Sequence, residues 1–119
     1  MLVWDYTCRC TLAPSNVMAT AVEAGKAAVK AEQDKLAHYQ ELSRNYIVTP
    51  VAMETMGSWG PAGLAFVKEI GQRIQECTGE KRSTSYLLQS ISMVAQRGNV
   101  ASVRGSLPNA RTLDELFYL

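Results

Sequence analysis

Apolar and polar positions follow a helical period from about residue 15 to residue 44, which predicts one long helix over residues 15–44. Ser15 suits the N-cap, and Gly25 is a weak position that a long helix tolerates. At about 100° per residue, one apolar stripe of this helix lies within about 40° of a single line. The stripe consists of Val17, Ala21, Ala24, Ala28, Ala31, Lys35, Tyr39 and Leu42. Because lysine is rarely buried without a partner, Lys35 requires an acid from the element that packs against this helix.

The segments on either side of the long helix are rich in β-forming residues and are predicted to be strands, over residues 2–11 and 46–55. Pro50 in the second segment favours an edge position or a bulge. Alternation along the first strand gives one face with Val3, Asp5, Thr7 and Arg9, and another with Trp4, Tyr6, Cys8 and Cys10. Two strands joined through a helix are expected to lie parallel, by a right-handed crossover.

Two further helices are predicted, one from Pro61 to about residue 77 and one over residues 82–96. Thr112 and Glu115 form a capping box for a final short turn. The order strand, helix, strand, helix, helix is an α/β pattern. Since two strands are too few for a stable sheet, we expect either a missing N-terminal portion or a partner strand that completes the sheet.

Composition places the chain among ordinary globular domains, with 119 residues, 47% hydrophobic and 19% charged. Three cysteines at irregular spacing favour a reducing intracellular setting over a disulfide framework, and no apolar run reaches the length of a membrane span. The charge is asymmetric: residues 1–80 carry 7 basic and 9 acidic side chains, whereas residues 81–119 carry 5 and 2. The basic C-terminal part indicates a surface that faces a polyanion.

Asp5 and Lys35 form the first candidate site, because the long helix must cover the strand that carries Asp5. A carboxylate that holds Mg²⁺ and a lysine near the attacking water are the parts of a metal-dependent nuclease. Glu32, one turn before Lys35, is positioned to neutralise it or to join the metal shell. Glu54 is a further carboxylate at a strand's C-terminal end, where the sites of α/β proteins gather.

Structural roles are open for each of these residues. Asp5 can accept hydrogen bonds from neighbouring backbone or from Thr7, and Lys35 can extend past the alanine stripe to solvent and pair with Glu32. Glu54 can cap the loop that follows it. Periodicity alone does not choose between these roles and the nuclease reading.

Several segments together resemble non-long-terminal-repeat retrotransposon proteins, which carry a reverse transcriptase followed by a restriction-endonuclease-like domain. The similar segments are residues 2–7, residues 11–15, Ala31-Glu32 with Lys35 and Tyr39, residues 50–57, and Gln96-Arg97-Gly98-Asn99. The resemblance extends to about Gly105 and implies that Asp5 is the second catalytic acid and a metal ligand. It implies that Lys35 is the relocated catalytic lysine, with Tyr39 as its packing or hydrogen-bonding neighbour.

Three features depart from the family pattern. The first catalytic acid, in an Arg/Lys-Pro-Asp strand, has no counterpart; the reverse transcriptase is absent; and His38 stands where similar sequences have a second lysine. The expectation is therefore a partial PD-(D/E)xK restriction-endonuclease-like domain over residues 1–106, followed by a tail over residues 107–119. With one carboxylate of the metal pair missing, Mg²⁺ binding and cleavage should be badly weakened.

In complete form such a domain would nick DNA with Mg²⁺ so that the freed end primes reverse transcription, in the nucleus if functional. Asp5 and Glu54 are the predicted metal ligands, and Lys35 and Glu32 assist the chemistry. The predicted contacts to DNA phosphates are Lys81, Arg82, Arg97 and Arg104. The alternatives from other classes are a small non-catalytic α/β interaction module and a co-opted nucleic-acid-binding fragment.

Overall fold

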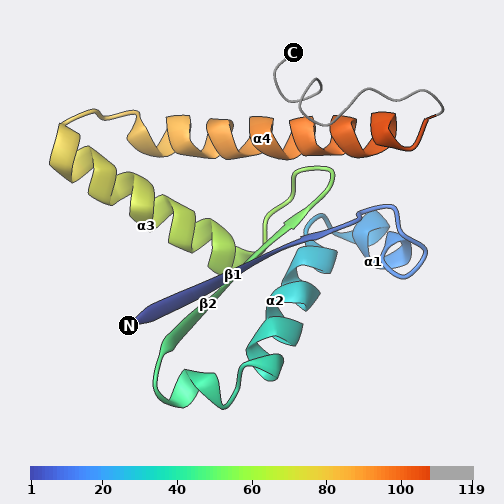
Figure 1. The fold of residues 1–119 in the computed structure, drawn as a ribbon, viewed down its shortest axis with the longest axis horizontal. Helices are drawn as coiled ribbons and strands as arrows, with labels where there is room; N and C mark the ends of the chain where they lie inside the picture. Colours follow the sequence, from blue (N-terminus) through green and yellow to red (C-terminus); the bar gives the residue numbers. More distant parts are fainter. Residues whose placement is uncertain (108–119) are drawn as a thin grey trace.

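A computed structural model describes residues 1–107 as a mixed α/β fold, in which two parallel strands are accompanied by helices (Figure 1). The elements are β1 (Leu2–Arg9), α1 (Val17–Val22), α2 (Lys26–His38), the short 3-10 turn η1 (Leu42–Arg44), β2 (Ile47–Glu54), α3 (Pro61–Thr78) and α4 (Ser83–Gly105). The α/β class predicted from the sequence is confirmed.

The two strands pair in parallel over their whole length, from Leu2 opposite Ile47 to Arg9 opposite Glu54. This confirms the predicted parallel arrangement and both strand positions. Each strand is also an edge of this two-stranded sheet. An edge strand tolerates Pro50 because proline has no N–H to donate to a neighbouring strand. Pro50 lies directly opposite Asp5 in the register.

The single helix predicted over residues 15–44 is wrong. The chain instead forms α1, α2 and η1, and the break between α1 and α2 falls at Gly25, which has φ +87°. A side chain there would be strained, and its Cβ would lie 3.3 Å from the carbonyl oxygen of Trp59. Gly25 is the N-cap of α2, at a point where the loop after β2 passes close to its backbone.

Small residues bring the helices close to the sheet. Ala28 and Ala31 of α2 form a fully buried cluster with Ala52 of β2. On the other face of β2, a Cβ at Gly63 of α3 would lie 3.1 Å from the Cα of Val51, so α3 approaches the strand closely. The sheet thus has α2 on one face, and α3 covers β2 on the other.

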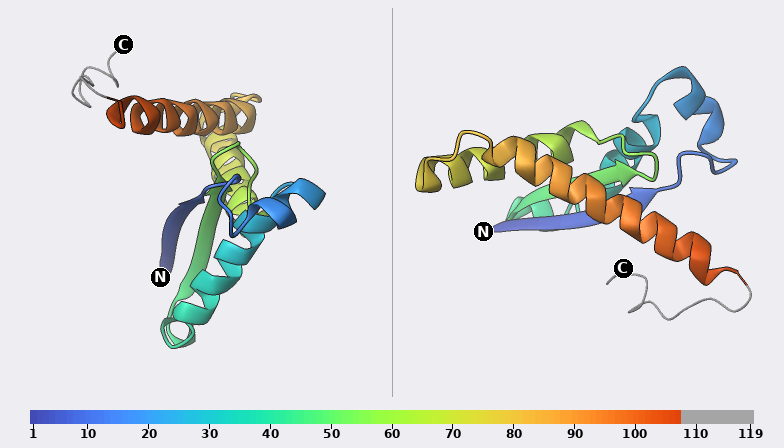
Figure 2. Two further views of the ribbon diagram at one scale, coloured as in Figure 1. Left: turned by 90° about the vertical axis from the view of Figure 1, so that its right-hand side faces the viewer. Right: turned by 90° about the horizontal axis from the view of Figure 1, so that it is seen from above.

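Of the last two helices, α3 has about the predicted length and α4 is longer than predicted. α3 begins at Pro61 and closes at Gly79, which has φ +76°, as a C-terminal glycine does. α4 continues to Gly105, so the predicted end near residue 96 is wrong. α4 lies across the end of the sheet where β2 terminates (Figure 2), and Asn99 there donates a 2.7 Å hydrogen bond to the carbonyl of Thr55.

The capping box predicted at Thr112 and Glu115 lies outside the described residues. Within residues 1–107, none of the helices combines the length and apolar character that a crossing of the lipid bilayer requires.

Candidate functional site

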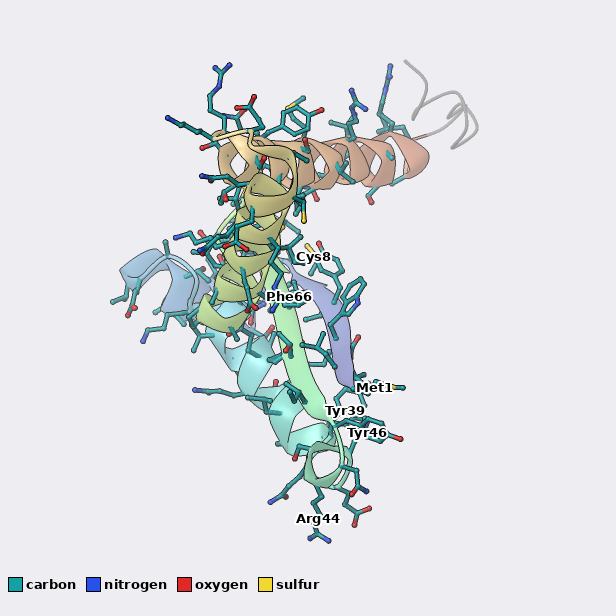
Figure 3. The ribbon with its side chains drawn as sticks, turned by 90° about the vertical axis from the view of Figure 1, so that its left-hand side faces the viewer. Met1, Cys8, Tyr39, Arg44, Tyr46 and Phe66 are labelled. Atoms are coloured by element: carbon teal, nitrogen blue, oxygen red, sulfur yellow. The ribbon has the colours of Figure 1, made fainter. Side chains whose placement is uncertain are left out.

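Asp5, Lys35 and Tyr39 meet between β1 and the last turn of α2. The Lys35 ammonium forms an ion pair with Asp5 Oδ2, and the Tyr39 hydroxyl donates a 3.0 Å hydrogen bond to the same oxygen. The side chains of Lys35 and Asp5 are 26% and 28% exposed, so the pair is reached from solvent at one side. Tyr39 lies near the start of the strands, where Figure 3 labels Met1. The predicted contact between the strand acid and the helix lysine is confirmed, and it explains the charge within the apolar stripe.

The site is built from two periodicities. Strand alternation turns Asp5 toward α2, while the four-residue spacing of Lys35 and Tyr39 places both side chains on one side of the helix. The hydrogen bond from Lys35, and next the one from Tyr39, hold the pKa of the Asp5 carboxyl below its ordinary value of 3.8. Asp5 is therefore an anion at neutral pH, and a partly exposed ammonium already lies beside it.

Glu32 contacts the start of α3 and is not part of the Asp5 cluster. Its side chain is buried at 4% exposure and accepts hydrogen bonds from the backbone N–H groups of Ala62 and Gly63, at 3.1 and 2.8 Å. A Cβ at Gly60 would overlap its carboxyl group, so a side chain there would displace Glu32 from this contact. Glu32 thus accepts the free amides at the start of α3. In the described part of the chain the ion pair of Lys35 is with Asp5, so the alternative pairing with Glu32 is not formed.

Glu54 lies at the start of α2. Its side chain is fully buried, and Oε1 accepts hydrogen bonds from the backbone N–H groups of Ala27 and Ala28, at 3.0 and 3.4 Å. Oε2 has no hydrogen-bond partner among residues 1–107. Glu54 pairs in register with Arg9, four residues beyond Asp5, which is about 13 Å along the strand. The two carboxylates predicted to share a metal ion are therefore not brought together.

The residues described do not by themselves supply the paired acids of a Mg²⁺ site. No group of three or more His, Cys, Asp or Glu side chains is positioned to hold a metal ion within residues 1–107. Mg²⁺ takes hard oxygen ligands in near-octahedral geometry. Of the two predicted metal ligands, Glu54 is fully buried and Asp5 is partly exposed, and Oδ2 of Asp5 already accepts hydrogen bonds from Lys35 and Tyr39.

The four basic residues predicted to contact DNA lie elsewhere. Lys81 and Arg82 precede α4, while Arg97 and Arg104 lie on it, and all four are exposed. Arg97 and Arg104 are seven residues apart, about two turns, so they leave α4 on the same side. The helix that carries them faces the Trp4 side of β1, opposite the side on which Asp5 meets α2. The structure does not bring them together with Asp5.

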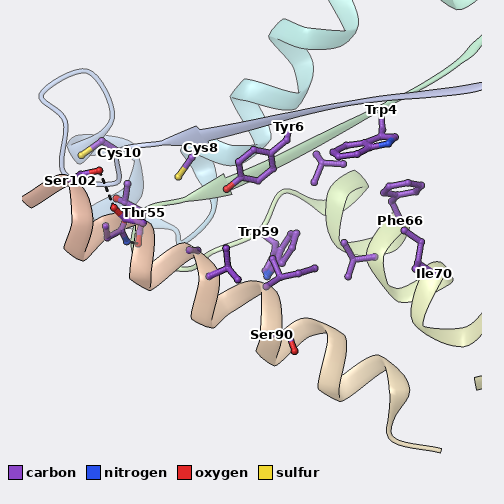
Figure 4. Close-up of a pocket in the computed structure, with 17 residues that line it drawn as sticks. Trp4, Tyr6, Cys8, Cys10, Thr55, Trp59, Phe66, Ile70, Ser90 and Ser102 are labelled. Atoms are coloured by element: carbon purple, nitrogen blue, oxygen red, sulfur yellow. Dashed lines mark hydrogen bonds between the residues drawn. The ribbon is translucent and has the colours of Figure 1, made fainter. Parts of the chain in front are cut away.

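An apolar groove that sequence reasoning missed lies on this opposite side (Figure 4). Its volume is about 980 Å³, and none of its lining residues is charged. β1 contributes Trp4, Tyr6 and Cys8, and helices α3 and α4 form the other walls. The alternation of β1 indicated this aromatic face, but the positions of α3 and α4 could not be read from the sequence.

No protein-family model matches the chain, and neither the curated proteins nor the solved structures include one with detectable similarity to it. Membership of the retrotransposon family therefore stays a proposal that depends on the residues and contacts described above.

Proposed function

We propose that this chain is an incomplete restriction-endonuclease-like domain of a non-long-terminal-repeat retrotransposon protein. In complete form the domain would nick DNA in a Mg²⁺-dependent reaction whose product end primes reverse transcription. The observation that supports the proposal is the contact of Asp5 with Lys35 and Tyr39. An acid inside a strand, an amine on the covering helix and a hydroxyl one turn later are the parts that the resemblance assigns to the catalytic centre.

The chemistry of the three residues suits a phosphodiester. The Asp5 anion and the Lys35 ammonium lie side by side and remain partly exposed, so a phosphate could approach the ammonium from solvent. Lys35 would then offset negative charge at that phosphate, and Tyr39 would keep the Asp5 carboxylate oriented. Mg²⁺ would supply the Lewis acid, but Glu32 and Glu54 are bound to helix amides instead of to Asp5. We therefore expect no DNA cleavage by this chain alone.

The proposal assigns DNA contacts to Lys81, Arg82, Arg97 and Arg104 and a nuclear location to a functional protein. Between Lys81 and Leu107 the chain has no acidic residue, which supports an attraction to phosphate. Because these residues lie away from Asp5, DNA binding and metal binding should be separable by mutation.

A manganese titration tests the metal half of the proposal. Isothermal titration with Mn²⁺ should show weak binding to the wild-type chain that Asp5→Asn abolishes. Asp34→Asn is the matched control, since Asp34 lies on α2 beside Arg9 at 54% side-chain exposure. Equal Mn²⁺ binding by wild type and Asp5→Asn would show that Asp5 is not a metal ligand, and would contradict its assignment to a nuclease site.

A plasmid-nicking assay with Mg²⁺ or Mn²⁺ tests the catalytic half. We expect no nicking above background. Nicking that disappears in both Asp5→Asn and Lys35→Met would show an active centre and overturn the expected inactivity, while it would strengthen the assignment of the two residues.

A second candidate function is a non-catalytic interaction module. The observation that favours it is the open edge of β1, which within residues 1–107 pairs with β2 along its other edge only. Unpaired edges are sites where a partner strand adds to a sheet. Light scattering on the purified chain separates the cases, since a folded monomer that stays soluble has no need of a partner strand.

A further inference from the structure

The hydrogen bonds between the two strands show which residues of β1 face the outer edge of the sheet. Ile47 N–H donates a 3.1 Å hydrogen bond to the Met1 carbonyl, and Thr55 N–H donates one of 2.9 Å to the Arg9 carbonyl. Backbone groups of successive residues in a strand turn to alternate sides, so the odd-numbered residues of β1 bond to β2. The residues that turn their N–H and C=O groups outward are Leu2, Trp4, Tyr6 and Cys8.

The outer edge of β2 is already occupied. Pro50 has no N–H to offer there. The Ala52 carbonyl accepts a 2.8 Å hydrogen bond from Gly60 N–H, and Glu54 N–H donates one of 2.7 Å to the Ser58 carbonyl. Proline and a covering loop are two of the devices that keep the edges of a sheet from pairing with other strands.

β1 has neither device within residues 1–107. It contains no proline, pairs with β2 without a bulge and forms the outer side of the sheet (Figure 2). The side chains of its outward-bonding residues are uncharged, and Trp4 and Tyr6 are 59% and 46% exposed. An uninterrupted edge of eight residues is a template on which another strand can pair.

We propose that β1 pairs antiparallel with β1 of a second copy of this chain, which gives a four-stranded sheet in the order β2-β1-β1-β2. Such a pairing has a two-fold axis, so the same edge serves both copies and the dimer closes on itself. The proposal deepens the second candidate function, because it names the partner strand, and it does not depend on metal or DNA binding.

Charge and length select the register of this pairing. Because the outward-bonding residues are all even-numbered, the two-fold axis passes through a residue that lies opposite itself. An axis at Asp5 would place two carboxylates directly opposite each other, which is unfavourable. An axis at Thr7 would pair only residues 5–9 of each β1.

An axis at Tyr6 avoids both problems. It pairs residues 3–9 of each β1 and places Asp5 opposite Thr7 of the second copy, so no like charges face each other. Trp4 then lies opposite Cys8 of the second copy, and the row of side chains that lines the groove continues across the axis. The outward-bonding residues would exchange about six backbone hydrogen bonds in this register.

The available area sets the expected strength of the dimer. Trp4 and Tyr6 together leave roughly 200 Å² of side chain exposed, to which the backbone of the edge adds its own surface. A standard protein interface buries about 800 Å² on each partner. We therefore expect a dimer that dissociates on dilution.

Sedimentation velocity over a concentration series tests the dimer. The wild-type chain should change from monomer to dimer as its concentration rises. Tyr6→Lys places two ammonium groups opposite each other at the axis, so it should need a concentration at least about tenfold higher. Tyr86→Lys is the matched control, because Tyr86 is 73% exposed and does not line the groove, and it should dimerise as wild type does. Circular dichroism checks that each variant is folded.

A disulfide test of the register keeps the proposal falsifiable if Tyr6→Lys fails to fold. Tyr6→Cys is combined with serine at the three native cysteines, and a second chain keeps only Cys8. Opposite residues with their backbones bonded lie about 5.5 Å apart at Cα, within disulfide range, whereas Cys8 would lie about 14 Å from its own copy. Mild oxidation should therefore cross-link the Tyr6→Cys chain at least about fivefold more than the Cys8 chain.

The outcomes separate this proposal from the function on which it rests. A dimer that Tyr6→Lys does not weaken, or cross-linking that is equal in the two single-cysteine chains, would overturn the pairing at Tyr6 and leave the chain an interaction module with a different contact. A folded wild-type chain that stays monomeric throughout the series would overturn both.

Discussion

The two faces of the sheet differ in how closely helices cover them. On the α2 face, alanines allow the helix to lie close, and Asp5, Glu32 and Glu54 each end on a specific partner. On the opposite face, large side chains of β1 meet an open groove. These three carboxylates join neighbouring elements on one face, whereas the aromatic side chains of β1 stay exposed on the other.

The largest expected effect is at Glu32. Glu32→Ala removes the acceptor of two backbone N–H groups at the start of α3 and leaves them buried, which should lower the free energy of unfolding by about 3 kcal/mol. Glu41→Ala, at an exposed position after α2, should change it by less than about 0.5 kcal/mol. Urea denaturation followed by circular dichroism measures both. Similar values for the two variants would show that the α2 face does not depend on this carboxylate.

Added side-chain volume should destabilise the α2 face more than the groove face, and this is the next largest expected effect. Ala31→Leu adds three carbons where α2 lies against Ala52, so it should cost about 2 kcal/mol. Ser90→Leu adds a similar volume at the open groove and should stay within about 0.5 kcal/mol of wild type. Equal losses in thermal and urea denaturation would mean that the groove is packed as tightly as the α2 face.

Alanine substitutions at two glycines should change the stability in opposite directions. Gly25→Ala places a side chain at φ +87° and close to the Trp59 carbonyl, so it should destabilise the chain by about 1–2 kcal/mol. Gly98→Ala lies inside α4 with open space around its Cβ position and should stabilise it by about 0.5–1 kcal/mol. A stabilising Gly25→Ala would indicate that α1 and α2 can join into one helix.

The smallest effect is the acid dependence of the Asp5 contact. Because its folded-state pKa is lowered below 3.8, the carboxylate stabilises the fold above that value and loses its contribution as the pH falls through the folded-state pKa. The stability difference between wild type and Asp5→Asn should therefore shrink between about pH 5 and about pH 2. Denaturant titrations across this range measure it, and a difference that is constant with pH would show that the ion pair contributes nothing.

Much of the architecture could be predicted because it depends on local pattern. Alternation in β1 and four-residue spacing in α2 placed Asp5 and Lys35 in contact, and Pro61 marked the start of α3. The break at Gly25 could not be predicted in the same way. A glycine within a helical pattern is ambiguous until the Trp59 carbonyl that approaches it is known.

The partners of Glu32 and Glu54 were beyond local reasoning for a related reason. Each carboxylate binds the start of a helix about 30 residues away in the sequence, so its role depends on the packing of whole elements. α4 continues past Gly98 because Asn99 is held by the end of β2, another distant contact. The catalytic and DNA-binding roles assigned to these residues stay predictions.

The placing of Asp5 and Glu54 at opposite ends of α2 has a consequence for strand alignment. A slip of β1 by two residues would keep every side chain on its proper face, so hydrophobicity alone cannot forbid it. The slip would carry Asp5 about 7 Å away from Lys35 while Glu54 stayed anchored through β2. Asp5 on β1 and Glu54 on β2 contact opposite ends of α2. Because the length of α2 is fixed, the two contacts together set the register of β1 against β2.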